Sequence, residues 1–311
     1  MQKRYYGLPY MGSKRKIADK LVSFMLKENP NAKYFYDLFG GGGAISFEVL
    51  QRQQIDQVFY NELNTGITEL LKDVLKNGVT EKYYQWISRE KYFENYNGND
   101  FIAGLCQCIW SFGGIQRSYI YGKNIMADKL LLHNIIVNGC EKSLEIICKK
   151  FNIKINNTVN SFFGETIYEK RIRIMSNIKS QNSRLQHLQL EHLQRLQHLQ
   201  HLQHLERLQR LEHLQRLKIT NKSYIDVNIS TPINETIIYL DPPYEKTGQY
   251  REKLNHKELY NYITKSPYKI YLSSYQSELP CALEIEHRST LGNNKAVTEK
   301  LFTNNNSDYK Q

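Results

Sequence analysis

The stretch that decides the fold is residues 34–50, YFYDLFGGGGAISFEVL. Tyr34, Phe35 and Tyr36 form the short apolar run of a buried strand, and a helical run follows the glycines. Four consecutive glycines permit positive φ and let a ligand approach the backbone closely, and the start of the helix presents unpaired N–H groups. This pattern predicts a strand, a ligand-binding turn and a helix, the opening unit of an α/β sheet.

A second strand, residues 58–60, leads into Glu62. The acid follows the glycines by about twenty residues, the spacing at which nucleotide-binding folds place a ligand for ribose hydroxyls. The dinucleotide-binding fingerprint G-x-G-x-x-G is incomplete. If its first glycine is Gly40, its third would stand at position 45, which is Ile45. A nicotinamide enzyme is therefore disfavoured. Glu62 is the candidate ribose ligand, and its alternative is a solvated acid at the start of a helix.

A third strand delivers a polar corner in residues 236–244, TIIYLDPPY. Ligands of open α/β sheets bind beyond the carboxyl ends of the strands. There Asp241 and the rigid Pro242 carbonyl can accept the N–H groups of a base amine, which returns its delocalised lone pair to nitrogen, while Tyr244 stacks on the base. A base in a duplex would have to flip out to arrive. The alternative is an ordinary turn, since Pro and Asp favour turns.

Four motifs in this order resemble those of the Dam-type, α-group adenine-N6 DNA methyltransferases, which use S-adenosylmethionine. They are PYMGSK at residues 9–14, DLFGGGG at 37–43, NE at 61–62 and DPPY at 241–244, with weaker likeness at 272–275 and 288–290. The resemblance covers the two ends of the chain and the middle only loosely. It implies an α/β, Rossmann-like methyltransferase fold, with a mixed, mostly parallel sheet and helices on both faces.

The resemblance also implies a role for each matched residue. The residues placed against S-adenosylmethionine are Tyr10, Lys14, Asp37, Phe39, Gly40, Gly42, Glu62, Tyr224 and Asp241. The catalytic residues, which bind the flipped adenine while the methyl group passes directly to its nitrogen, are Asp241, Pro242, Pro243 and Tyr244. One position departs from the family: Ser223 replaces the acid that normally precedes the aromatic residue near the cofactor's adenine, and Asp226 is a candidate substitute.

The middle of the chain, residues 66–183, is expected to form a smaller, mainly helical target-recognition domain. Its most informative part is the loop at residues 110–123, WSFGGIQRSYIYGK. Its donors and flat side chains suit base edges and phosphates. The residues expected to contact DNA are Gln116, Arg117, Tyr119, Tyr121 and Lys123. The alternative is a tyrosine-rich loop with a structural role only.

Residues 184–217 form a low-complexity insert with leucine at every third position from 190 to 217. On a helix each such step turns by about 300°, so the leucines drift around the axis and form no single stripe. Good helix formers predict a helix with imperfect packing or partial disorder. His198, His201 and His204 are expected in solvent rather than on a metal. As a hypothesis, the insert adjusts contact with DNA or a partner.

The chain carries 42 Lys and Arg against 31 Asp and Glu, a formal charge of +11, which favours attraction to polyphosphate. The partner that the resemblance implies is double-stranded DNA. Its five cysteines have no paired metal-ligand spacing, so reduced thiols and no metal are expected. No apolar stretch is long enough to span a bilayer. We expect a cytoplasmic, nucleoid-associated protein of prokaryotic or phage type, a monomer or weak dimer, with a cognate restriction endonuclease as a candidate partner.

These observations predict a discontinuous catalytic domain of residues 1–65 and 218–303 and a flexible tail of residues 304–311. The predicted function is site-specific transfer of a methyl group from S-adenosylmethionine to the N6 amine of a flipped-out adenine. Two other classes stay open. One is methylation of cytosine N4 or of RNA, and the other is an inactive homologue that only binds DNA or acts as a scaffold.

Overall fold

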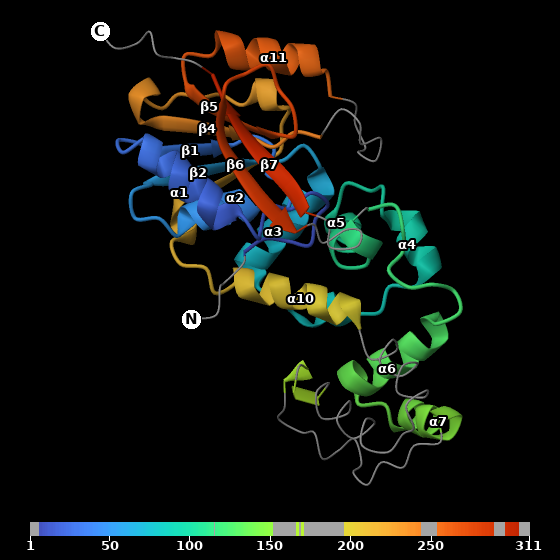
Figure 1. Cartoon of the computed structure of the whole chain (residues 1–311). Helices are drawn as coiled ribbons and strands as arrows, with labels where there is room; N and C mark the ends of the chain where they lie inside the picture. The colour runs from blue at the N-terminus through green and yellow to red at the C-terminus, as the bar shows by residue number, and fades with distance from the viewer. Residues whose placement is uncertain are drawn as a thin grey trace.

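The computed structural model describes residues 6–114, 116–151, 166–167, 169–170, 196–243, 254–288 and 296–304 (Figure 1). Its centre is a seven-stranded sheet of order β3-β2-β1-β4-β5-β7-β6. The strands are β1 (Tyr34–Asp37), β2 (Gln57–Asn61), β3 (Leu217–Thr220), β4 (Thr236–Leu240), β5 (Lys269–Ser274), β6 (Cys281–Arg288) and β7 (Ala296–Thr303). The first five are mutually parallel, and β7 runs antiparallel to β5 and β6. The predicted mixed, mostly parallel sheet is confirmed.

Helices cover both faces of this sheet because successive strand residues point to opposite sides. On one face, Phe35 packs with α1 (Ala18–Glu28) and α2 (Ala44–Leu50). On the other, Tyr36 packs with Leu259 and Ile263 of α11 (His256–Lys265). Every residue of β4 is buried, as expected for a central parallel strand covered on both sides. The helices on both faces agree with the predicted Rossmann-like fold.

The chain between β2 and β3 is helical in its described parts and has its own core. We call it the helical unit; in Figure 1 its helices α4, α6 and α7 extend away from the sheet. The helices are α3 (Thr65–Asn77), α4 (Arg89–Asn95), α5 (Phe101–Cys108), α6 (Met126–Asn138), α7 (Glu141–Phe151) and α10 (Gln197–Leu208). Tyr60 of β2 belongs to the same core, so the helical unit is anchored to the sheet.

The described part of the insert is an integral element of the helical unit. Helix α10 buries Leu199, Leu202, Leu205 and Leu208 in that core. Four leucines at this spacing cover about half of the helix circumference, which requires partners over an unusually wide arc. The core of the helical unit provides that arc. The prediction of imperfect packing is therefore wrong for α10. Residues 184–195 of the insert lie outside the described residues.

The expectation that the insert histidines face solvent is not met by His201 and His204, which are half-buried, and it is wrong for His198. Its side chain is fully buried, because on a helix it falls within the arc of the leucines. One ring nitrogen lies 2.6 Å from the Tyr121 hydroxyl and the other 2.9 Å from Nδ1 of His133. His201 is half-buried and its Nδ1 lies 2.9 Å from the carbonyl oxygen of Ile109. These histidines join the insert to α5 and α6.

Several predictions concern residues at the edge of the described chain. Asn304, expected to begin a flexible tail, is buried, and its side-chain oxygen accepts the Ile270 N–H at 2.9 Å. Tyr244 and residues 289–290 and 305–311 lie outside the described residues. In the described part of the chain, no helix has both the length and the apolar character needed to cross a membrane.

Candidate active site

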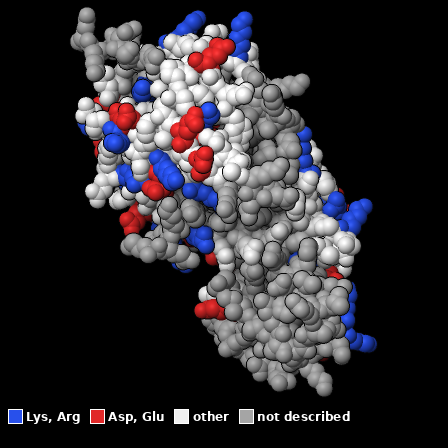
Figure 2. Space-filling view, viewed as in Figure 1, with Lys and Arg blue, Asp and Glu red and all other residues white. Residues whose placement is uncertain are grey.

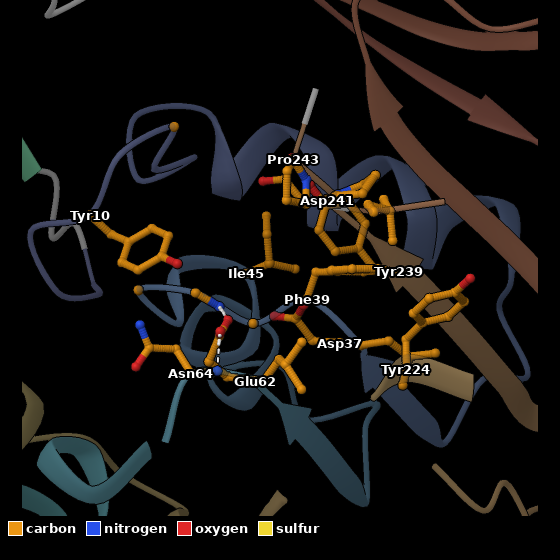
Figure 3. Close-up of a pocket in the computed structure, with 18 of the residues that line it drawn as sticks. Tyr10, Asp37, Phe39, Ile45, Glu62, Asn64, Tyr224, Tyr239, Asp241 and Pro243 are labelled. Carbon is orange, nitrogen blue, oxygen red and sulfur yellow. Dashed lines mark hydrogen bonds between the residues drawn. The ribbon is translucent and has the colours of Figure 1, made fainter. Parts of the chain in front are cut away.

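The glycine loop (residues 40–43) and the Asp241 corner (residues 241–243) line one cavity of about 460 Å³ (Figure 3). β1 and β4, which deliver them, are adjacent parallel strands, with Asp37 in register with Tyr239. The strand order reverses between β1 and β4, the crevice where open α/β sheets bind ligands. The structure therefore brings together the two motifs that lie far apart in the sequence.

The glycine loop has its shape because side chains would not fit there. A Cβ on Gly40 would lie 2.2 Å from the Tyr60 ring, and one on Gly42 would lie 2.8 Å from the carbonyl oxygen of Leu8. The Tyr60 hydroxyl also donates to the Gly41 carbonyl at 2.7 Å. Tyr60 of β2 therefore packs against the glycine loop, and the backbone of this loop forms part of the cavity wall.

Glu62, at the end of β2, braces the glycine loop from the cavity side. Its Oε2 accepts the Gly41 N–H and its Oε1 accepts the Asn64 N–H, both at 2.8 Å (Figure 3). Glu62 is only 9% exposed and lines the cavity. Each carboxylate oxygen has a second lone pair, so the group can still accept a ligand hydroxyl. The alternative of a solvated acid does not hold.

Asp37, at the end of β1, is a buried carboxyl on the cavity wall. Its Oδ2 accepts the Ser46 hydroxyl at 2.7 Å, whereas Oδ1 is buried and has no hydrogen-bond partner. Burial raises the pKa of Asp37 to about 7; the charges of Asp241 and Glu62 act in the same direction and the Ser46 bond opposes them. A buried acid of this kind would be stabilised in its ionised form by a cationic ligand.

Asp241 forms an ion pair that the DPPY motif does not predict. Lys14 Nζ lies 2.9 Å from Oδ1 of Asp241 and 3.5 Å from Oε1 of Glu299. Lys14 is 6% exposed and lines the cavity, and Asp241 is the nearer of the two carboxylates to this lysine, which was expected to contact the cofactor. Pro242 and Pro243 also line the cavity. Sequence reasoning missed Glu299, which lies beyond the motifs used.

Aromatic side chains line the other end of the cavity. The Phe39 and Tyr224 rings lie 5.2 Å apart, and Tyr10 faces them across the opening (Figure 3). Asp226 lies instead on a separate surface hollow, whereas Glu258 of α11 lines the cavity. In this structure Glu258, and not Asp226, is the acid on the wall shared with Tyr224.

The loop of residues 110–123 separates into buried and exposed members. Tyr119 and Tyr121 are 5% and 2% exposed and pack in the core of the helical unit, so neither ring presents a face to DNA. The structural-loop alternative holds for these two tyrosines. Arg117 and Lys123 are exposed. Gln116 lines the cavity with a φ of 64°, a strained conformation for a residue with a side chain.

A sheet of this order, with a glycine turn and the Asp241 corner on one cavity, is typical of the Rossmann-like methyltransferases. A family model described as D12 class N6 adenine-specific DNA methyltransferase matches residues 10–279, most of the chain. The chain belongs to this family and is a site-specific DNA methyltransferase that acts on adenine N6. No curated protein matches the sequence. The predicted family and activity are confirmed.

Members of this family take the methyl group from S-adenosylmethionine, and the cavity fits such a group. Asp37 Oδ1 is a buried oxygen without a partner, suited to a cationic donor, and Glu62 is an acceptor for hydroxyls. Within the described residues no group of three or more His, Cys, Asp or Glu side chains is arranged to hold a metal ion.

Proposed function

We propose that this cavity holds S-adenosylmethionine against the glycine loop and a flipped-out adenine against the Asp241 corner. The observation that carries the proposal is that both motifs line the same cavity at the reversal of strand order. Its volume of about 460 Å³ falls within the usual range of about 300 to 1,000 Å³ for small-ligand sites.

On the donor side, the bound cofactor supplies a methyl group on a cationic sulfur. Asp37 would balance the positive charge of its methionine portion, and the backbone of Gly40 and Gly42 would let it approach closely. Glu62 would accept its ribose hydroxyls. Phe39 and Tyr224 would enclose its adenine ring, with Tyr10 and Lys14 on the facing wall.

On the acceptor side, Asp241 and the Pro242 carbonyl would accept the two N–H groups of the target amine. These bonds shift the lone pair toward nitrogen and make it a better nucleophile. Pro242 and Pro243 have fixed φ, so the acceptors are held in place before the base arrives. The Asp241 carboxylate pairs with Lys14 at 2.9 Å, and no covalent bond to the protein is required.

The substrate would be double-stranded DNA, from which the target adenine must flip at a cost of roughly a few kcal/mol. Arg117 and Lys123 are suited to phosphates, and Gln116 to the displaced base or its neighbours. On the face shown in Figure 2, Lys and Arg side chains lie among Asp and Glu side chains in the upper part of the described surface. The protein would act where the DNA is, as a monomer or weak dimer, alone or beside a cognate restriction endonuclease.

The test is incubation of the purified protein with methyl-labelled S-adenosylmethionine and unmodified genomic DNA, followed by mapping of the modified bases. We expect N6-methyladenine at one recurring short sequence and a rate of labelling lower by roughly 10² to 10³ with Asp241→Ala. Label in cytosine, or transfer to RNA in a parallel reaction but not to DNA, would contradict the proposal.

A further inference from the structure

Lys14 is buried between two carboxylates that come from different parts of the chain. Asp241 is 20% exposed and Glu299 is 3% exposed, and their oxygens lie 2.9 and 3.5 Å from Lys14 Nζ. The same ammonium also donates to the Gly12 carbonyl at 3.3 Å. Three oxygens therefore surround a group that has three N–H donors.

Glu299 is itself held firmly. Its Oε1 accepts the Ser273 hydroxyl at 2.6 Å, and Ser273 lies on β5 beside β7. Because β5 neighbours β4, and Asp241 directly follows β4, the sheet fixes both acids relative to each other. Lys14 comes from a loop before α1, so its position depends on these two acids rather than on its own element.

The charges in this cluster keep Lys14 protonated. Burial lowers the pKa of Lys14, but the charges of Asp241 and Glu299 outweigh burial and the net direction is upward. Among the described residues, the ion pairs of this cluster join two carboxylates to one cation. Without that cation, two acids would face each other in a buried site, and one of them would take up a proton.

We propose that Glu299 is a positioning residue for the methyl transfer: it holds Lys14 against Asp241, and Lys14 keeps that carboxylate ionised and oriented toward the target amine. The inference rests on the proposed function of Asp241. It gives Lys14 a role at the catalytic acid and gives a residue outside the motifs a part in the reaction.

The titratable residues that neighbour the cluster are the same in the wild type and in every variant proposed below. Tyr239 and Tyr275 lie close to it, and their pKa values are raised, chiefly by burial, so both stay neutral. Asp37 interacts with Asp241 and has a pKa raised to about 7 by burial. Since all three are unchanged in the variants below, differences between pH profiles report on Lys14 and Glu299.

The experiment is a pH profile of the single-turnover rate of methyl transfer, at saturating cofactor and DNA, for wild type, Lys14→Met, Glu299→Gln and the double variant. Lys14→Met should move the acidic limb up by at least about one pH unit, because one neighbouring charge of opposite sign is lost. In the double variant, loss of the Glu299 charge should reverse at least half of that upward shift of the acidic limb. In separate steady-state assays at varied substrate concentrations, Glu299→Gln alone should lower kcat about tenfold and leave the KM for both substrates within about twofold.

Glu284→Gln is the matched control, because it removes an exposed acid that pairs with Lys300 at 2.7 Å on the neighbouring strand. It should leave rate and profile unchanged, and circular dichroism should show all variants folded. Superimposable acidic limbs for Lys14→Met and the double variant would overturn the inference. Absence of transfer by the wild type would instead refute the proposed function, so the two failures are distinguishable.

Discussion

The cavity wall and the core of the helical unit each bury titratable side chains, but in different settings. In the helical unit, His198 bonds to Tyr121 and His133, and burial lowers the pKa of His133 to about 4, so it stays neutral. On the cavity wall, Asp37 has a buried oxygen without a partner and a pKa raised to about 7. The ring nitrogens of His198 both have protein partners, whereas Asp37 Oδ1 has none and lies on the wall of the cavity in which we propose a cationic ligand.

The difference teaches that burial alone does not mark a site. A buried polar group costs free energy unless it is paired, so an unpaired one beside a cavity indicates a ligand that supplies the missing partner. Substitutions in the two regions should therefore have different effects. Those on the cavity wall should change catalysis and ligand affinity, and those in the helical core should change stability.

The largest effect is expected at the Asp241 corner. Asp241→Ala removes the acceptor for the target amine and should lower the turnover rate by roughly 10² to 10³, the size typical of a lost transition-state hydrogen bond. Cofactor and DNA affinity should be retained. Rapid-quench assays and equilibrium binding measure the two quantities, and unchanged methyl transfer would remove the proposed role of this residue.

The next effect should appear in the helical core. Leu202→Ala leaves a cavity beneath α10 and should lower the free energy of unfolding by about 2 to 5 kcal/mol. Methyl transfer per folded molecule should stay the same. Leu130, 36% exposed on α6, is the matched control, and Leu130→Ala should change stability by less than about 0.5 kcal/mol. Equal losses in denaturant titrations of both variants would contradict the buried position of α10.

On the donor side, Glu62→Ala removes an acceptor for the cofactor and a brace of the glycine loop. Cofactor affinity should fall by about 1 to 3 kcal/mol. The control is Glu69→Ala, which removes an exposed acid paired with Lys72. Calorimetry measures both. No change for Glu62→Ala would refute its assignment.

The smallest effect is a pH dependence that comes from Asp37. Because its folded pKa lies above the ordinary value, the folded protein keeps this proton between about pH 4 and 7 while the unfolded chain has lost it. The group therefore costs stability as pH rises through that window. A cationic cofactor favours the ionised form, so its affinity should rise with pH up to about 7, by at most about tenfold per unit, and then level.

Asp37→Asn has no proton to release and should abolish that slope. Cofactor dissociation constants measured from pH 6 to 8 test this, together with proton release on binding in two buffers of different ionisation enthalpy. A flat profile for the wild type would show that Asp37 does not face the cation.

Local patterns were sufficient for much of the site. The glycine loop, Glu62 and Asp241 each follow a short strand in the sequence, and carboxyl ends of neighbouring parallel strands meet at one edge of a sheet. The tyrosines at 119 and 121 were misjudged because their ring faces suit DNA and a protein core equally well. Only packing distinguishes the two, and the helices that bury them come from distant segments.

The amino-acid sequence by itself determined the class of fold, the family and the two motifs of the active site, since each depends on residues that are close together along the chain. The tertiary structure alone decided the rest. It decided that the leucines of α10 are buried, that Lys14 pairs with Asp241, and that Glu299 joins them. These facts arise from contacts between residues far apart in the chain, and no local pattern records which distant charge or surface will be the partner.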